Sequence, residues 1–307
     1  MISVICNHLN LFKYAPLTLQ SIKNQKFSDY EIIVIDAGSD NYNLDSLKKY
    51  CQSDKKIRII QQIDDGPNYG YNTGIMQSKG DILMFVNISD YIEPNLFKRA
   101  LGHFETDQDI LSVAGGYNHL TESGQILKKQ IYKKRFANFA DLTNYHLPHL
   151  SSIFTKKEVF QRYGFFSTDR ILKRCTTTDF IKFYFNTLND KKKILFDDLI
   201  YCNYLKHENN SRPKEIRKFF LVSARRKICR KMYQKFNKLL CEKEKHALLT
   251  EDLKYKLKIC IYAKDILRFF KTIIQIYKIS NLKNLIRVIN IVFKTYISDY
   301  FRMTEKF

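Results

Sequence analysis

A carboxylate that follows a buried strand is the feature of this sequence that points most directly to chemistry. Residues 82–86 are apolar throughout, and the loop after them contains Asn87, Ser89 and Asp90. Open α/β sheets bind their ligands outside the carboxyl ends of their strands, which is where this loop must lie. Carboxylate oxygens are also the ligands that Mg²⁺ and Mn²⁺ prefer. The loop is therefore a candidate site for a cation that bridges the phosphates of a nucleotide.

The amino-terminal region is expected to supply a second polar strand end. Residues 2–6 and 31–35 are apolar and predict two strands, and residues 16–25 between them have helical spacing. A strand, a helix and a strand over so short a stretch form a βαβ unit, which implies parallel pairing. Asp36 directly follows the second strand.

These segments together resemble the inverting glycosyltransferases of family two, which have the GT-A fold. That family shows Asp-Gly-Ser-x-Asp after its second strand and Leu-Asn-Ser-Asp-Asp after a later one. The positions that match it are Ser21, Ile22, Gln25, Glu31, Asp36, Gly38, Ser39, Asp64, Gly66, Asn72, Gly74, Gly80, Asp81, Asn87 and Asp90. The resemblance covers about residues 1–208. It implies an α/β fold with a GT-A-like, Rossmann-related mixed sheet flanked by helices.

The resemblance also implies which residues bind the donor. The expected nucleotide-sugar contacts are Asp36, Ser39, Asp64, Asn72 and Asn87. In relatives the counterpart of Asp36 accepts a hydrogen bond from the uracil ring of a UDP-sugar. Asp36 and Ser39 could instead simply cap the next helix, and the residues alone leave both interpretations open.

The expected cofactor is Mn²⁺ or Mg²⁺, and the resemblance assigns it to Asp90 and His207. The family's usual pair of acids reads Ser89-Asp90 here, so the first acid is missing. A catalytically silent GT-A scaffold is therefore an alternative hypothesis. His207 follows the last predicted strand and could equally be an exposed loop residue.

An inverting transfer needs a second carboxylate that takes the proton from the acceptor hydroxyl as the new bond forms. The resemblance assigns this role to Asp179, because it follows a His149-x-x-x-x-Phe segment and a Gly-x-Phe segment, at the predicted start of a helix over 180–185. Asp179 could instead be a plain helix N-cap. His149 could equally be a histidine of the core.

The last third of the chain differs in composition. Most of the net charge of +21 lies after residue 200, where 26 Lys and Arg stand against 9 Asp and Glu. This segment has a single proline and no glycine, so it is expected to be almost wholly helical. We therefore predict two domains, a GT-A-like domain over 1–208 and a basic amphipathic helical region over 209–307.

Two basic stripes in this region have helical spacing. The residues of the stripes are Lys264, Arg268, Lys271, Gln275 and Lys278, then Lys283, Arg287, Asn290 and Lys294. Broad apolar faces accompany both, but no run approaches the roughly 18 uncharged residues needed to span a bilayer. Such helices suit an anionic membrane surface. They could also pack on each other or on the rest of the protein with their lysines solvated.

We expect a cytoplasmic protein, peripheral on the inner face of the cell membrane, because no basic and apolar leader precedes the first strand and the seven cysteines are scattered. The predicted function is metal-dependent transfer of a sugar, with inversion, from a UDP-sugar or another nucleotide-sugar. The acceptor is expected to be a glycan or a polyprenyl-linked molecule in surface polysaccharide assembly. A nucleic-acid-binding protein that uses the basic region is the remaining alternative, although no nucleic-acid motif is present and nucleic acid is not an expected partner.

Overall fold

The computed structural model of the protein describes residues 1–143, 148–169, 172, 176–207, 226–232, 234–236, 238, 240–262, 266–279, 286 and 288–290. The chain forms two compact units. The first unit consists of Met1–Asn138 and His146–Arg212, and the second of Phe139–Tyr145 and Pro213–Phe307. The domain boundary predicted after residue 208 lies outside the described residues, so it stays a prediction.

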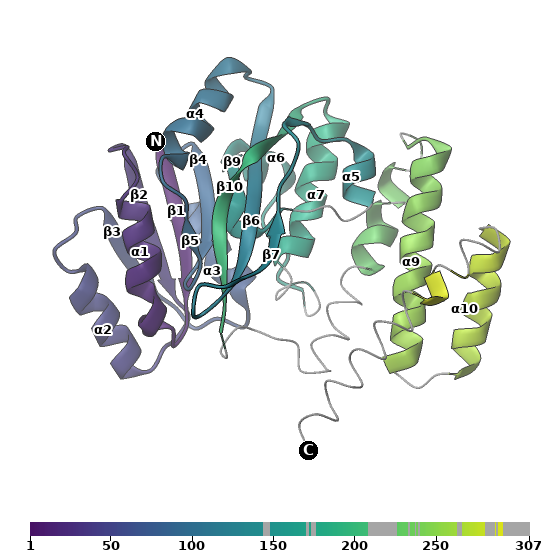
Figure 1. Cartoon of the computed structure of the whole chain (residues 1–307), viewed down its shortest axis with the longest axis horizontal. Coiled ribbons are helices and arrows are strands. Elements are labelled where there is room, and N and C mark those ends of the chain that lie inside the picture. Colours follow the sequence, from purple (N-terminus) through teal and green to yellow (C-terminus); the bar gives the residue numbers. More distant parts are fainter. Residues whose placement is uncertain are drawn as a thin grey trace. The chain divides into compact units, whose positions relative to one another are not determined.

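The first unit is built on a ten-stranded mixed sheet, labelled in Figure 1. The strands are β1 Ile2–His8, β2 Tyr30–Asp36, β3 Ile57–Gln61, β4 Ile82–Asn87, β5 Tyr91–Ile92, β6 Ile110–Thr121, β7 Ile126–Gln130, β8 Arg135–Phe136, β9 Ile153–Lys156 and β10 Lys193–Lys206. Their spatial order is β3-β2-β1-β4-β9-β6-β10-β5, with β7 paired to β6 and β8 paired to β10.

The parallel part of the sheet gathers the polar strand ends at one edge. β1 pairs in parallel with β2 on one side and with β4 on the other, as the βαβ pattern predicted. The register aligns His8 with Asp36, and Asn7 with Asn87. β9 runs antiparallel to β4 and β6, which makes the sheet mixed.

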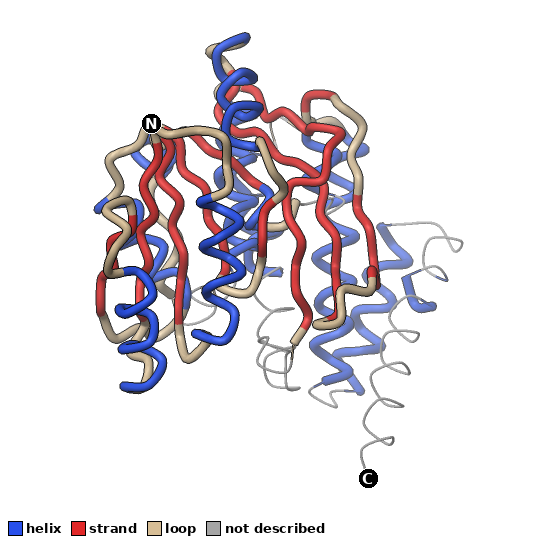
Figure 2. Tube along the Cα trace, turned by 60° about the vertical axis from the view of Figure 1, so that its left-hand side comes forward, coloured by secondary structure: helices blue, strands red, loops and turns tan. Residues whose placement is uncertain are grey.

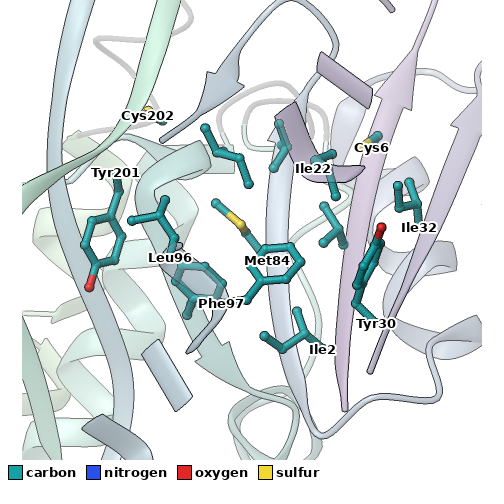
Figure 3. Packing of buried hydrophobic residues seen from close by; sticks show 14 of the residues in the cluster. Ile2, Cys6, Ile22, Tyr30, Ile32, Met84, Leu96, Phe97, Tyr201 and Cys202 are labelled. Carbon is teal, nitrogen blue, oxygen red and sulfur yellow. The ribbon is translucent and has the colours of Figure 1, made fainter. Parts of the chain in front are cut away.

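Helices cover both faces of the sheet, as Figure 2 shows. The helical elements of the first unit are η1 Phe12–Tyr14, α1 Ala15–Lys23, α2 Asn41–Cys51, α3 Pro67–Gln77, α4 Leu96–Thr106, η2 Leu150–Ser152, α6 Glu158–Tyr163 and α7 Thr176–Asn189. Successive strand residues point to opposite faces, so the near-continuous apolar strands bury side chains on both sides. α1, α2 and α4 pack on one face of the sheet. Figure 3 shows Ile22 of α1 and Leu96 of α4 in the same cluster as Met84 of β4.

The opposite face packs against α3, α6 and α7. Phe85 of β4 makes ring contacts with Tyr71 of α3, Phe160 of α6 and Phe180 of α7. α3 lies especially close to β1, because a Cβ placed on Gly74 would come within 2.2 Å of Ile5 Cγ2. The side chains of α3 are thereby fixed against the centre of the sheet.

One helix boundary differs from the prediction. The sequence placed the start of a helix at Phe180, with Asp179 before it, but α7 begins at Thr176. Thr176 Oγ1 donates to Asn68 Oδ1 at 2.6 Å, so a long-range contact holds the first residue of α7. Asp179 consequently lies inside the helix.

The second unit contains α5 Phe139–Thr143, α9 Glu242–Tyr262 and α10 Ile266–Ile279 among its described residues. Leu253 and Leu257 of α9 form a buried cluster with Ile276 of α10 and with Val288. None of the helices that the structure describes combines the length and apolar character needed to cross a membrane. Of the predicted basic stripes, Lys264, Lys283, Arg287 and Lys294 lie outside the described residues.

Candidate functional site

Asp90 is fully buried beyond the carboxyl end of β4, where the sequence predicted a metal ligand. Its Oδ2 accepts a hydrogen bond from Ser151 Oγ at 2.6 Å and another from Asn87 Nδ2 at 3.0 Å. Its Oδ1 is also buried and has no hydrogen-bond partner among the described residues. Burial raises the pKa of Asp90, and the nearby His149 and the two hydrogen bonds oppose this rise only in part. A carboxylate with one unsatisfied oxygen can accept a further ligand.

His149 lies beside Asp90. Its Nδ1 is 3.7 Å from Asp90 Oδ2 and accepts a hydrogen bond from the Ser151 backbone N–H at 3.3 Å. A nitrogen that accepts from this N–H cannot also donate to the carboxylate. Burial lowers the pKa of His149. His149 thus orders the short η2 turn that carries Ser151.

The surroundings of Asp90 fit a cation that is held mainly by a nucleotide. The described residues contain no group of three or more His, Cys, Asp or Glu side chains that could hold a metal ion. Mg²⁺ characteristically binds through one or two carboxylates plus substrate phosphates and water, so the free Oδ1 of Asp90 suffices as an anchor. His207, the second predicted ligand, stacks on Tyr14 with the ring centroids 4.3 Å apart. Burial lowers the pKa of His207, and the charges of Glu122 and, to a smaller extent, Asp90 oppose this change.

The loop before Asp90 is strained. Ser89 has a φ of 113°, a backbone conformation that non-glycine residues rarely adopt. Its backbone N–H donates to Thr18 Oγ1 of α1 at 3.0 Å. Strain of this kind persists where the surrounding structure imposes it, and it is common at functional sites. The Thr18 hydroxyl therefore holds the backbone turn that carries Asp90.

Asn87 connects Asp90 to α3. Its Oδ1 accepts a hydrogen bond from Tyr71 Oη at 2.6 Å, while its Nδ2 donates to Asp90. Tyr71 itself is buried. Both polar atoms of Asn87 are engaged within the protein, so its predicted contact with a nucleotide-sugar would need a further or a rearranged hydrogen bond.

The predicted base, Asp179, is also buried. Like Asp90, it lies near residues that are hydrogen-bonded to α3. Its Oδ2 accepts from the Ser167 backbone N–H at 2.5 Å and from Lys182 Nζ at 3.1 Å. The first donor belongs to the loop before α7, so Asp179 is not acting as a plain N-cap. Burial raises the pKa of Asp179, and the charge of Lys182 opposes the rise. A raised pKa suits a group that must accept a proton near neutral pH.

Two asparagines of α3 hold the segment that precedes α7. Asn72 exchanges two hydrogen bonds with the Phe166 backbone, each of 2.9 Å. Asn68 donates to the carbonyl oxygens of Ser167 and Leu172. α3 therefore contacts the surroundings of Asp90 through Tyr71 and those of Asp179 through this segment. Asn72, predicted as a donor contact, uses both its polar atoms in these bonds.

Asp36 closes β2 and is buried next to β1. Its Oδ1 lies 2.8 Å from His8 Nδ1, and its Oδ2 accepts from the backbone N–H groups of Gly38 and Ser39. Burial opposes ionisation, but the hydrogen bonds from Ser39 and His8 hold the pKa of Asp36 below its usual range. The N-cap of α2 is Asp40, so neither Asp36 nor Ser39 serves as that cap.

The remaining residue predicted to contact the nucleotide-sugar, Asp64, precedes α3. Its Oδ1 accepts a hydrogen bond from Gln62 Nε2. Burial raises the pKa of Asp64. A Cβ on Gly70 would come within 2.9 Å of Asp64 Oδ2 and 2.5 Å of Asn7 Oδ1, so the first turn of α3 lies directly on these two side chains.

The sequence did not reveal several residues that organise the site. They are His8, Asn68, Tyr71, Ser151 and Ser167. His8 could have been found as a polar residue at the end of an apolar strand. Ser151 and Ser167 had no local signal, because their partners lie in other parts of the chain.

Parallel strands with acids beyond their carboxyl ends define an α/β protein with a candidate ligand site at that edge of its sheet. The family model for "Glycosyl transferase family 2" matches residues 3–164, more than half of the chain. The chain belongs to this family.

Curated relatives share this family at low identity. EpsJ of Bacillus subtilis, an uncharacterised glycosyltransferase, is 25% identical over 143 residues, which are 47% of this chain and 42% of EpsJ. The chain thus matches less than half the length of EpsJ. WbnJ of Escherichia coli, an O-antigen biosynthesis glycosyltransferase, is 24% identical over 226 residues, which are 70% of this chain and 84% of WbnJ.

Solved structures confirm the predicted fold class. TarS 1–349 of S. aureus in complex with UDP-GlcNAc superposes with a TM-score of 0.65 at 17% identity, covering 91% of this chain and 81% of TarS 1–349. The mannosyltransferase PcManGT of Pyrobaculum calidifontis, in complex with GDP-Man and Mn²⁺, gives 0.58 at 12% identity, covering 98% of this chain and 82% of that chain. The fold is thus the GT-A-like mixed sheet flanked by helices.

Proposed function

We propose that this protein is an inverting glycosyltransferase that transfers a sugar from a UDP-sugar to a glycan or a polyprenyl-linked acceptor in surface polysaccharide assembly. The observation that carries the proposal is the pair of buried acids, Asp90 and Asp179, whose pKa values are both raised. Perturbed carboxylates are common in catalytic sites, and Asp90 lies beyond the carboxyl end of β4, where α/β sheets bind their ligands. The relationship to WbnJ supports the polysaccharide context.

In the proposed reaction the acceptor hydroxyl oxygen attacks the anomeric carbon from the face opposite the diphosphate. The bond from that carbon to the diphosphate oxygen breaks, and the hydroxyl proton passes to Asp179. The configuration inverts because the new bond forms opposite the broken one. Lys182, which donates to Asp179, opposes the rise in the pKa of this carboxyl and so favours the ionised form that can accept the proton.

The donor end of the site is assigned to the carboxyl edge of β1, β2 and β4. Asp36, Ser39, Asp64, Asn72 and Asn87 are proposed to contact the nucleotide-sugar. The amide of Asn72 also positions the Phe166 segment, so its proposed contact with the nucleotide-sugar would be made in addition to these two hydrogen bonds.

Asp90 and His207 would hold Mn²⁺ or Mg²⁺. A bound cation would neutralise the charge that develops on the leaving diphosphate. The free Oδ1 of Asp90 supports this assignment, and the Mn²⁺ bound with GDP-Man in PcManGT is consistent with it.

A lipid-linked acceptor would require the enzyme to work at a membrane surface. The proposal therefore includes a peripheral position on the inner face of the cell membrane. The strongly basic region after residue 200 supports attraction to anionic lipid.

A thermal-shift screen of nucleotide-sugars, with and without Mn²⁺, tests the proposal directly. We expect stabilisation by UDP and by one or more UDP-sugars that depends on the metal, and slow metal-dependent hydrolysis of the preferred donor. Asp90→Ala should abolish both effects. Donor binding without turnover in any condition would instead favour a catalytically silent scaffold, which the Ser89 replacement makes the second candidate.

A further inference from the structure

α10 presents three different faces rather than the single polar stripe and broad apolar remainder that its sequence indicates. One face packs on α9 through the apolar side chains Ile273 and Ile276, with Phe269 at its margin. Thr272, on the same face, is fully buried. This contact accounts for only part of the apolar surface of the helix.

A second apolar face of α10 is exposed to solvent. Leu267 is 78% exposed, Phe270 58%, Ile274 54% and Tyr277 57%. These residues are spaced by three, four and three positions, so at about 100° per residue their directions fall within about 80° of one another. Four large apolar side chains in one continuous row are unusual on a surface that faces only water.

The third face is basic and borders the exposed row. Arg268 and Lys271 are both exposed and, at about 100° per residue, lie between the exposed row and Thr272 of the side that faces α9. Gln275, on the same polar side, accepts a hydrogen bond from Lys256 Nζ of α9 at 2.8 Å, which brings a further cation to this side. The exposed apolar row is thus flanked by positive charge on one side and by the α9 contact on the other.

We infer that the exposed face of α10, made of Leu267, Phe270, Ile274 and Tyr277, inserts shallowly into an anionic lipid surface, with Arg268 and Lys271 at the headgroups. α10 has 14 residues, too few to span a bilayer, so it would lie in the plane of the interface. The positive border selects an anionic bilayer over a neutral one. This inference deepens the membrane location in the proposed function, but it rests on the surface of α10 and not on the transfer chemistry.

Co-flotation of the full-length protein with vesicles tests the inference. One set of vesicles is phosphatidylcholine alone, and the other is phosphatidylcholine mixed with phosphatidylglycerol. We expect binding to the mixed vesicles, weaker binding to the neutral ones, and a decrease but not a loss of binding in high salt, because screening removes the electrostatic part and leaves the apolar part.

Two variants separate the contributions. Leu267→Gln/Phe270→Gln/Ile274→Gln removes the apolar row and is expected to weaken binding at least about tenfold. Arg268→Glu/Lys271→Glu is expected to weaken binding to the mixed vesicles by about 25-fold or more, at about fivefold for each basic residue. The matched control, Leu17→Gln/Tyr42→Gln/Met76→Gln, changes exposed apolar residues on helices of the first unit and should bind as the wild type does.

Several results would overturn the inference. Equal vesicle binding by the wild type and the apolar-row variant would do so. A melting temperature that falls in the apolar-row variant would show that the row is covered by the protein itself. A wild-type dimer that becomes monomeric in this variant, with no vesicle binding, would show that a second copy covers it. Donor hydrolysis, measured in the same samples, is expected to be unchanged in all variants. If the wild type binds vesicles but does not hydrolyse the nucleotide-sugar donor, the result would count against the proposed transferase activity alone.

Discussion

Replacing Asp90 with asparagine should stabilise the metal-free protein while removing its response to metal. The amide of the Asp90→Asn variant can keep an oxygen in the place of Oδ2, where Ser151 and Asn87 donate, but it carries no charge. The raised pKa of Asp90 means that its surroundings favour the neutral form even after these hydrogen bonds are counted. Because the wild type must keep a buried charge at neutral pH and the variant does not, we expect the free energy of unfolding to rise near neutral pH.

The pH dependence of the free energy of unfolding provides a second test of whether Asp90→Asn stabilises the protein. A carboxyl whose pKa is raised on folding stabilises the protein below its unfolded pKa, and this contribution is lost as pH rises through the folded pKa. The advantage of Asp90→Asn over the wild type should therefore be absent in acid and should grow as the pH rises towards neutrality. Urea denaturation at a series of pH values measures both curves.

Asp197 is the matched control, because it is equally buried but has the opposite electrostatic surroundings. Arg99 donates to its two carboxylate oxygens at 2.5 and 2.6 Å, Tyr201 Oη donates at 2.6 Å, and these hydrogen bonds hold its pKa well below the usual range. Asp197→Asn should lower the free energy of unfolding by about 3 kcal/mol at neutral pH, and by less as the pH falls. If Asp90→Asn destabilises the metal-free protein as Asp197→Asn does, Asp90 is a structural carboxylate and the reasoning is refuted.

Three further predictions concern the base, the support of Asp90 and the packing of α3. Asp179→Asn should lower the transfer rate roughly a hundredfold or more with UDP affinity unchanged, and a loss that merely follows the folded fraction would contradict its role as a base. Ser151→Ala removes a buried hydroxyl that donates to Asp90, so the free energy of unfolding from urea titration should fall by about 2 kcal/mol, and an unchanged value would be contrary to this. Gly74→Ala should cost about 1–3 kcal/mol through overpacking against Ile5, whereas Gly102→Ala in α4, where a Cβ meets nothing within 4 Å, should be neutral or stabilising in the same measurement.

The sequence was informative wherever a local pattern decides the structure. The apolar runs of β1, β2 and β4 are continuous because both faces of these strands are covered. The same apolar runs placed Asp36 and Asp90 at strand ends, because a polar residue that follows such a run marks where the strand leaves the core. Parallel pairing followed from the helix between β1 and β2.

Long-range contacts could not be predicted in this way. Ser151 lies 61 residues from Asp90, and Asn68 lies 104 from Leu172, so neither hydrogen bond leaves a local signal. The first residue of α7, Thr176, is likewise held by a long-range hydrogen bond to Asn68. The apolar periodicity of α10 was recognised, but only the position of α9 determines which half of that surface is buried.

The division of the chain between the two units has a consequence for synthesis on the ribosome. Phe139–Tyr145 belongs to the second unit although the segments on both sides of it belong to the first, and its helix α5 packs against α9. α9 emerges roughly 100 residues after α5, which at about 5–20 residues per second is a delay of about 5–20 s. During this interval the buried Leu142 of α5 lacks its final environment, while the sheet of the first unit can already form. A nascent chain paused in this window exposes apolar surface that a chaperone would recognise, so expression should respond to chaperone level and to slow codons between α5 and α9.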